Sequence, residues 1–286
     1  MPSPTTGAIG LVPQAFELLQ QLICARFGLV YTIETAYLIE RRLQQRLEAH
    51  GLTSFLDYYH LLTDPAQPES RRERELQEIF ELLSTRETYF FRESYQLDAF
   101  REVLLPQLQK RRPRGNQLSV WSAGCASGEE PYSIAVEIIE SGLFDGWNVR
   151  VVGSDLSVQA LQAAVQGIYG PSSFRQTDPV RHSRYFRPLT GRWQINESVR
   201  RMCTFVRQNL VEDDFSAVGG PFDAIFCRNV IIYFDRAGRN RLIERLSDKL
   251  APGGYLFLGH AESLLDGNTP LGIAHLGREL VYRKPS

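Results

Sequence analysis

The sequence predicts an α/β protein in which an all-α N-terminal domain precedes a Rossmann-like domain that carries a small antiparallel β insertion. Three observations lead to this prediction. Apolar residues recur at helical spacing as far as residue 109, and short apolar strands alternate with helices after residue 118. Between residues 184 and 208 this alternation stops, because short strand-like runs follow one another there.

The first part of the chain contains a series of amphipathic helices. They are expected at residues 15–27, 34–50, 54–62, 71–83 and 94–108. Gly28 and Gly51 follow the first two as stop signals, and Ser94 is a favoured cap for the last. The next run, residues 110–117, is basic and contains proline and glycine. We therefore expect a helical domain over residues 12–109 and a linker over residues 110–117.

The second part of the chain alternates strands with helices. Strands are expected at residues 118–121, 149–154, 222–227 and 254–258, and helices at 129–141, 157–166 and 236–250. This alternation predicts a parallel sheet with right-handed crossovers in a domain over residues 118–286. The runs 185–187, 192–195 and 204–207 predict antiparallel strands of a β subdomain at about residues 184–208.

Composition excludes several classes of protein. The chain has 286 residues and a net charge of -1, so it lacks the basic excess of a protein that grips nucleic acid over a broad surface. Its four cysteines are far apart and form no CxxC pair, which argues against a metal site or a disulfide framework. No apolar run is long enough to span a membrane, and the N-terminus lacks a signal-peptide pattern. We expect a cytoplasmic protein without a metal.

The most informative segment is residues 121–133, where an apolar strand runs through a small-residue turn into a helix. Gly124 and Gly128 allow a backbone to approach a ligand closely, and the helix that begins near Glu129 offers free N–H groups. This arrangement is typical of a nucleotide-like cofactor site at the carboxyl end of the first strand of a doubly wound sheet. The alternative is a tight turn that binds no ligand.

An acidic residue, Asp155, stands at the tip of the second predicted strand. A carboxylate there can accept hydrogen bonds from both ribose hydroxyls of an adenosine, although Asp155 could instead cap the next helix. NAD and S-adenosylmethionine both fit this pattern. Glu129 and Glu130 lie where a pyrophosphate would meet the helix N-terminus, and two carboxylates would repel it. They favour the cationic sulfonium and ammonium groups of S-adenosylmethionine.

Four motifs, in order, resemble those of CheR-type chemotaxis receptor methyltransferases. They are residues 84–92 (STRETYFFR), 122–133 (SAGCASGEEPYS), 209–210 (NL) and 222–234 (FDAIFCRNVIIYF), within a resemblance over roughly residues 15–283. The resemblance implies a helical N-terminal domain, a Rossmann-like S-adenosylmethionine-dependent methyltransferase domain and a small inserted β subdomain. It implies a protein-glutamate O-methyltransferase that forms glutamate methyl esters and S-adenosylhomocysteine on chemoreceptors in chemosensory adaptation.

The resemblance also assigns site residues. It implies cofactor contacts for Thr88, Arg92, Ala123, Gly124, Glu129, Asp155, Asn209, Leu210, Asn229 and Val230. One of these has a plainer alternative, because Asn209 is a good turn residue. Phe90 and Phe91 of the first motif are expected to pack in the core or between domains rather than to contact the ligand. Arg228 could be a structural ion-pair partner. Arg86 stands where the family commonly has Asn, so we expect no ligand role for it.

The chemistry that the resemblance implies needs no general base, because a glutamate carboxylate with a pKa of about 4.3 is already ionised at neutral pH. Arg92 and Tyr233 are the candidates for orienting that carboxylate. An arginine that gripped it too tightly would stabilise the ground state, so Tyr233 is the expected hydrogen-bond donor. Residues 228–233 lack the N/D-P-P-Y/F motif of many enzymes that methylate nucleic-acid bases.

Basic side chains on the outward face of the predicted helix 34–50 are candidates for docking the receptor. Arg41, Arg42 and Arg46 could steer an acidic chemoreceptor signalling domain towards the enzyme, or could form an ordinary solvated face. We expect a monomer that does not insert into membranes or bind nucleic acid. The alternative functions are a non-catalytic S-adenosylmethionine-binding scaffold or sensor in a chemosensory complex, and a small-molecule methyltransferase.

Overall fold

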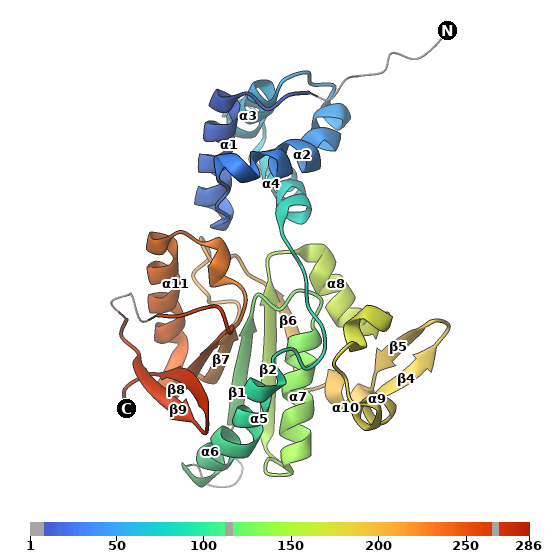
Figure 1. The fold of residues 1–286 in the computed structure, drawn as a ribbon, viewed down its shortest axis with the longest axis vertical. Helices are drawn as coiled ribbons and strands as arrows, with labels where there is room; N and C mark the ends of the chain where they lie inside the picture. The colour runs from blue at the N-terminus through green and yellow to red at the C-terminus, as the bar shows by residue number, and fades with distance from the viewer. Residues whose placement is uncertain (1–8, 112–116, 265–268) are drawn as a thin grey trace. The chain divides into compact units, whose positions relative to one another are not determined.

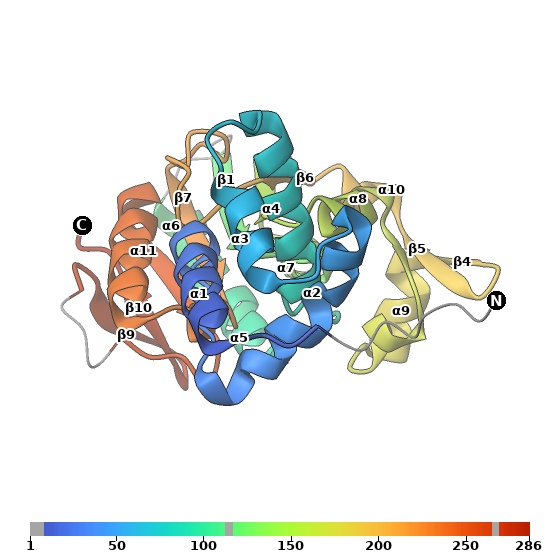
Figure 2. The ribbon, with the colours of Figure 1, turned by 90° about the horizontal axis from the view of Figure 1, so that it is seen from above.

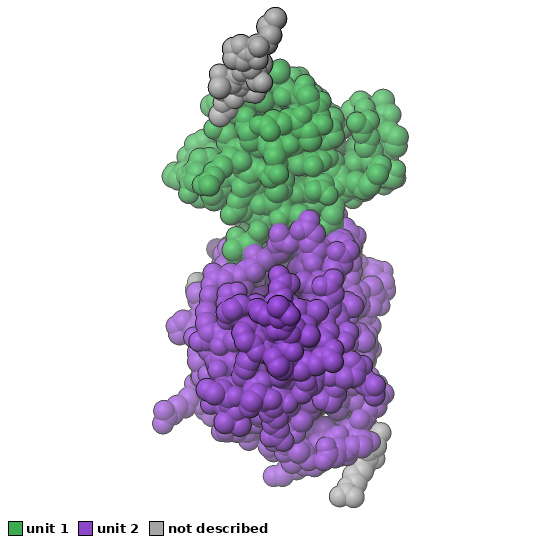
Figure 3. Space-filling model, turned by 90° about the vertical axis from the view of Figure 1, so that its right-hand side faces the viewer, with its two compact units in different colours: residues 1–85, 233–235 green, residues 86–232, 236–286 purple. Residues whose placement is uncertain are grey.

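The computed structural model describes residues 9–111, 117–264 and 269–286. They form two compact units (Figure 3). Unit 1 contains the chain up to Thr85 together with Tyr233–Asp235, and unit 2 contains Arg86–Ile232 and Arg236–Ser286. None of the helices within these described residues has the length and apolar character needed to cross a membrane.

Unit 1 is helical, as the apolar periodicity predicts. Its elements are α1 (Pro13–Phe27), the short 3-10 helix η1 (Ile33–Thr35), α2 (Ala36–His50), α3 (Phe55–Thr63) and α4 (Glu69–Leu83). Helix α2 buries Ile39, Leu43 and Leu47, which recur every four residues and so share one face. Ser54 caps α3 by accepting hydrogen bonds from the backbone N–H groups of the first turn.

Unit 2 is built on a seven-stranded sheet with the strand order β6-β2-β1-β7-β8-β10-β9 (Figure 1). Its strands are β1 (Gln117–Ala123), β2 (Asn148–Asp155), β6 (Cys203–Arg207), β7 (Phe222–Cys227), β8 (Leu250–Leu258), β9 (Gly272–Leu276) and β10 (Glu279–Arg283). The strands from β6 to β8 run parallel, and β10 pairs antiparallel with β8 and β9. The expected parallel sheet is confirmed, and the C-terminal β9–β10 hairpin extends it.

Helices between the strands cover the sheet. They are α7 (Glu129–Ser141), α8 (Val158–Gln166) and α11 (Arg236–Lys249). Each begins at the carboxyl end of the strand before it, as right-handed crossovers require. Viewed from above, α11 and the β9–β10 hairpin lie at one end of unit 2 (Figure 2). Helix α9 (Pro179–Tyr185) lies at the other end with strands β4 (Phe186–Leu189) and β5 (Arg192–Ile195).

The two units divide between Thr85 and Arg86, whereas the sequence placed the boundary at residues 110–117. Helix α5 (Ser94–Ala99), the π-helical turn η2 (Phe100–Leu104) and helix α6 (Leu105–Arg111) belong to unit 2. The reason is packing: the Phe100 ring lies 5.4 Å from Phe226 and 6.2 Å from Phe257, both in the sheet. Of the expected linker, residues 112–116 lie outside the described residues.

The small antiparallel sheet of the insertion exists, but its third strand is not the expected one. The order is β3-β5-β4, with β3 (Ile168–Tyr169), β5 (Arg192–Ile195) and β4 (Phe186–Leu189). Residues 203–207 instead form β6, which pairs parallel with β2 in the main sheet. Phe205 packs against α7, with its ring 5.4 Å from that of Tyr132. Alternation along a strand does not distinguish these partners, because it is the same in both kinds of sheet.

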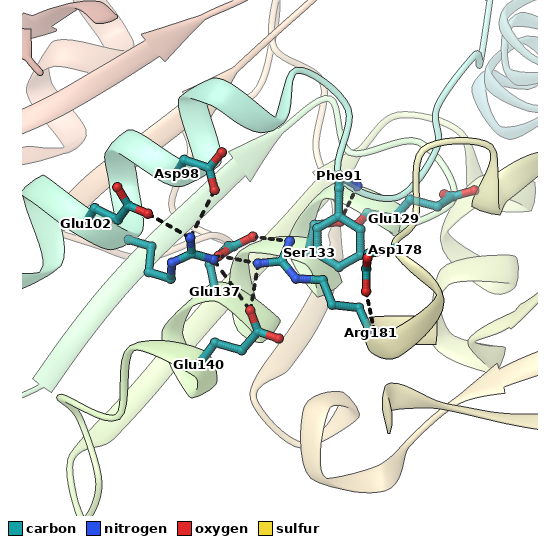
Figure 4. Close-up of polar contacts among 10 residues, drawn as sticks. Phe91, Asp98, Glu102, Glu129, Ser133, Glu137, Glu140, Asp178 and Arg181 are labelled. Carbon is teal, nitrogen blue, oxygen red and sulfur yellow. Dashed lines mark hydrogen bonds and ion pairs between the residues drawn. The ribbon is translucent and has the colours of Figure 1, made fainter. Parts of the chain in front are cut away.

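A buried charge network joins the insertion to the main domain (Figure 4). Glu137 of α7 is almost fully buried, and its carboxylate lies 2.7 Å from Arg101 of η2 and 2.8 Å from Arg181. Arg181 belongs to α9 (Pro179–Tyr185) and also lies 2.6 Å from Glu140 and 4.6 Å from the Phe91 ring centre. The network therefore holds α9 beside the segment that contains Phe91.

Candidate functional site

The turn between β1 and α7 has a backbone that depends on glycine. Gly124 and Gly128 have φ values of 80° and 91°, in the left-handed region that favours glycine. The N–H groups of Gly124 and Cys125 donate to the Ser154 carbonyl at 2.8 and 2.9 Å, which ties the turn to β2. A Cβ on Gly124 would lie 2.5 Å from the side chain of Val230. Two segments predicted to contact the cofactor, 123–129 and 229–230, are thus in direct contact.

Asp155 lies at the end of β2 and faces this turn. Its Oδ2 accepts a hydrogen bond from Ala126 N–H at 2.8 Å, and its Oδ1 accepts one from Ser157 N–H at 2.8 Å. Ser157 in turn caps α8 through Ala160 N–H. The alternative in which Asp155 itself caps the helix is therefore wrong, because Ser157 is the cap and Asp155 holds the backbone of Ser157 and of the glycine turn. A carboxylate oxygen can accept more than one hydrogen bond, and the contact of Asp155 with ribose hydroxyls stays a prediction.

Glu129, the first residue of α7, is 2% exposed. Its carboxylate accepts hydrogen bonds from the hydroxyls of Ser127 at 2.7 Å and Ser173 at 3.0 Å. Burial raises the pKa of Glu129, and these hydroxyls oppose the rise. Both donors are neutral, so neither offsets the charge of the carboxylate. A cationic group would stabilise this buried anion more than water can.

Glu130 has a different role from Glu129, so the two carboxylates do not act as a pair towards a cationic cofactor. Its carboxylate accepts hydrogen bonds from Ser122 and from Arg228 Nε, both at 2.6 Å. Arg228 is 6% exposed and also donates to the Arg92 carbonyl at 2.9 Å. Arg228 is thus the structural ion-pair partner that the sequence allowed. Of the two glutamates, Glu129 is the one without an arginine counterion among the residues that the structure describes.

The motif segment 84–92 enters unit 2 at Arg86. Arg92 is half-buried and donates a hydrogen bond to the Glu87 carbonyl at 2.9 Å. Arg175 packs over the Tyr89 ring at 3.8 Å and lies 2.6 Å from the Glu87 carboxylate. The segment is therefore held by local contacts, and Thr88 is half-buried within it. The predicted cofactor contacts of Thr88 and Arg92 stay predictions.

The two phenylalanines of this motif are packing residues, as expected. The Phe90 ring stacks on Phe174 at 5.3 Å, and Phe91 N–H donates to Ser133 of α7 at 3.0 Å. Arg86 donates to the Ser157 hydroxyl at 3.2 Å, which places it beside the start of α8. Arg86, the residue that departs from the family pattern, therefore contacts the residue that caps α8.

Asn209 follows β6, and its side chain shapes a turn. Its Oδ1 accepts a hydrogen bond from Val211 N–H at 2.9 Å, and its own N–H donates to Asp213 at 2.5 Å. The Leu210 carbonyl accepts from Arg245 at 2.8 Å. The turn role considered for Asn209 is therefore real. A contact of residues 209–210 with the cofactor stays a prediction.

Sequence reasoning missed Glu262, which holds the segment after β7. Its carboxylate accepts backbone hydrogen bonds from Asn229, Val230 and Ile232 at 2.8, 2.9 and 3.2 Å, and from Gly259 at 2.7 Å. The available signal was an acid shortly after the fifth parallel strand, β8.

Two of the three arginines assigned to receptor docking make contacts inside unit 1. Arg46 forms a bidentate pair with the buried Glu75 at 2.9 and 2.6 Å. Arg42 donates to the Leu83 carbonyl at 2.8 Å, at the end of α4. Arg41 is exposed. Arg41 is thus the arginine of this set that is most exposed, and docking of a receptor by the three arginines stays a prediction.

Tyr233, the candidate for orienting the substrate, is grouped with unit 1. Its carbonyl accepts a hydrogen bond from Val30 N–H at 3.0 Å. The role of its hydroxyl stays a prediction. Among the described residues, no group of three or more His, Cys, Asp or Glu side chains is arranged to hold a metal ion.

Two family models match the chain. The model described as CheR methyltransferase, all-alpha domain, matches residues 14–86, and the model described as CheR methyltransferase, SAM binding domain, matches residues 86–276. They meet at residue 86, which agrees with the division into units.

Curated relatives match most of the chain. Chemotaxis protein methyltransferase 2 of Vibrio cholerae serotype O1 is 34% identical over 260 residues, which are 90% of this chain and 88% of that protein. Chemotaxis protein methyltransferase 2 of Pseudomonas aeruginosa is 35% identical, covering 92% of each chain. Chemotaxis protein methyltransferase of Klebsiella aerogenes is 36% identical, covering 87% of this chain and 82% of the relative.

Proposed function

Because the chain belongs to the CheR methyltransferase family, we propose that it methylates glutamate side chains on the cytoplasmic signalling domain of a chemoreceptor. The products are glutamate methyl esters and S-adenosylhomocysteine, formed during chemosensory adaptation. The observation that best supports this proposal is the buried Glu129 carboxylate at the glycine turn, with neutral hydroxyls as donors. S-adenosylmethionine is the cofactor, and when bound it supplies an activated methyl group on a sulfonium.

The residues of unit 2 fit this cofactor by charge and shape. Glu129 offers a buried negative charge to the methionine ammonium, and Asp155 offers carboxylate oxygens to the ribose hydroxyls. Gly124 permits close approach of the backbone. The segment around Asn229 and Val230 would contribute the remaining wall.

The proposed reaction depends on positioning. A glutamate carboxylate is ionised at neutral pH, because its unperturbed pKa is about 4.3, so no base must remove a proton. The chain must hold the carboxylate in line with the methyl group and exclude water. We assign orientation of the carboxylate to Tyr233, and we assign Arg92 to the cofactor carboxylate, the substrate or both. Arg41 is the candidate for the first electrostatic contact with an acidic receptor helix.

The decisive experiment supplies tritiated S-adenosylmethionine and the signalling domain of a co-occurring receptor. Release of labelled methanol in base identifies a methyl ester on a carboxylate, and peptide mapping identifies the glutamate. Tight cofactor binding without transfer to any of several receptors would contradict the proposal and favour a non-catalytic scaffold. Turnover without a receptor protein would favour a small-molecule methyltransferase.

Replacing Asp155 with alanine should weaken binding of S-adenosylhomocysteine by about 10- to 100-fold, measured by calorimetry. This corresponds to about 1–3 kcal/mol for lost hydrogen bonds to a charged group. The structure adds a second reason, because Ala126 and Ser157 lose their acceptor as well. Asp145→Ala, at an exposed position in unit 2, is the control and should bind normally. Unchanged affinity of Asp155→Ala would remove Asp155 from the cofactor site.

Replacing Tyr233 with phenylalanine should leave the affinity for S-adenosylhomocysteine unchanged and lower the rate of receptor methylation by about tenfold or more. The reason is that the hydroxyl is assigned to the substrate carboxylate, and one hydrogen bond to a charged group is worth about 1.5–3 kcal/mol. Single-turnover transfer from a preloaded complex measures the effect. A rate equal to that of the wild type would exclude the hydroxyl from the mechanism.

A further inference from the structure

The carboxylate of Glu262 is enclosed by backbone donors. Its Oε1 accepts from Val230 at 2.9 Å and Ile232 at 3.2 Å, and its Oε2 accepts from Asn229 at 2.8 Å and Gly259 at 2.7 Å. These bonds gather several amides of one short segment around one anion. An ionised carboxylate is suited to this place, because both its oxygens only accept hydrogen bonds.

The segment that Glu262 holds has a conformation that needs support. Asn229 has a φ of 59°, in the left-handed region, which asparagine tolerates better than most residues but still less well than glycine. Gly259 allows the close approach, because a Cβ there would lie 2.9 Å from Asn229 N and from the Glu262 carboxylate. The carboxylate bonds can compensate for the strained backbone.

The same segment reaches the glycine turn. Val230 Cγ2 would lie 2.5 Å from a Cβ on Gly124, so the two elements are packed closely together at this point. Glu262 lies in the loop after β8, about 30 residues further along the chain than the segment it binds. These hydrogen bonds of Glu262 run to the segment itself and not to the glycine turn or β1. Glu262 thereby determines where Asn229 and Val230 lie.

We propose that Glu262 is a positioning residue for the cofactor, which fixes the backbone of residues 229–232 so that Asn229 and Val230 form one wall of the site. This inference rests on the cofactor placement in the proposed function, and it does not depend on the receptor. Glutamine at this position would replace one carboxylate oxygen with an NH₂ group, which cannot accept hydrogen bonds. The two backbone hydrogen bonds that this oxygen accepts would be lost.

The test compares Glu262→Gln and Glu262→Asp with the matched control Glu244→Gln, which lies at an exposed position of α11. Calorimetry with S-adenosylhomocysteine is performed well below the unfolding temperature of each variant. Glu262→Gln should bind about tenfold more weakly or worse, and Glu262→Asp, which keeps the carboxylate, should recover part of the loss. The control should bind within about twofold of the wild type.

Hydrogen exchange separates positioning from general support of the fold. In Glu262→Asp and Glu262→Gln, faster exchange should be confined to peptides covering residues 228–233 and 259–262, while β1 and β7 keep their protection. Normal affinity in Glu262→Gln would overturn the proposal, and so would a loss of protection spread over the whole sheet. If wild-type protein binds S-adenosylhomocysteine but methylates no receptor, the proposed function fails while this test remains valid.

Discussion

Replacing Glu75 with glutamine is expected to lower the free energy of unfolding of unit 1 by about 3 kcal/mol. Glu75 is 5% exposed, and it accepts hydrogen bonds from Arg46 at 2.9 and 2.6 Å and from the Tyr58 hydroxyl at 2.6 Å. Burial alone would raise the pKa of Glu75, but hydrogen bonds from Arg46, Tyr58 and His50 and the charge of Arg46 lower it to about 2. An amide loses the charge that makes these contacts strong.

The same carboxylate predicts the pH dependence of unit 1. The folded-state pKa of Glu75, about 2, lies below its ordinary value of 4.5. Its contribution is therefore complete above about pH 4.5 and is lost as the pH falls towards about 2, because the unfolded chain then binds the proton first. Wild-type protein should lose this increment between about pH 5 and pH 2, and Glu75→Gln should lack that part of the change.

Two probes assign the effect to the correct unit. The three tryptophans, Trp121, Trp147 and Trp193, all lie in unit 2, so urea unfolding followed by tryptophan fluorescence reports that unit. Far-UV circular dichroism reports the helices of both units. Glu75→Gln should shift the circular dichroism transition more than the fluorescence transition. Glu78→Gln is the matched control, because Glu78 is 48% exposed and lies 3.9 Å from the same arginine. Equal effects of the two substitutions would contradict the prediction.

The sequence predicted the two kinds of architecture well, because periodicity reports which face of an element is buried. It does not report which neighbour buries that face. Residues 94–111 were assigned to the helical domain for this reason, although Phe100 packs on the sheet of unit 2. The same limit affected residues 203–207, whose alternation fits both the insertion and the edge of the main sheet.

The positions of two candidate site residues in the fold could be predicted from the sequence. Asp155 and Glu129 stand at a strand end and a helix start, which are the places where a Rossmann-like domain meets its ligand. The pairing of Arg46 with Glu75 could not be predicted, because the two residues are 29 positions apart and no local pattern joins them. Glu262 was missed for a similar reason, since its carboxylate serves amides about 30 residues earlier in the chain.

Replacing Gly124 with alanine is expected to weaken S-adenosylhomocysteine binding by more than about 100-fold. The left-handed backbone, with φ 80°, costs an alanine about 1–2 kcal/mol. The added Cβ would also lie 2.5 Å from Val230 Cγ2, and overpacking of this kind costs about 1–3 kcal/mol. Either the turn or the Val230 segment must move, and both are assigned to the cofactor site. Calorimetry with S-adenosylhomocysteine measures the loss.

Two variants separate backbone strain from the steric clash. Gly146 has nearly the same φ, 78°, but a Cβ there would meet nothing within 4 Å. The free energy of unfolding of Gly146→Ala therefore shows the cost of backbone strain alone. Val230→Ala removes the atom that the new Cβ would strike, so Gly124→Ala combined with Val230→Ala should bind better than Gly124→Ala alone. If the losses of binding free energy in the two single variants simply add in the double variant, the two segments do not interact through this contact. Backbone strain would then account for the whole effect of Gly124→Ala.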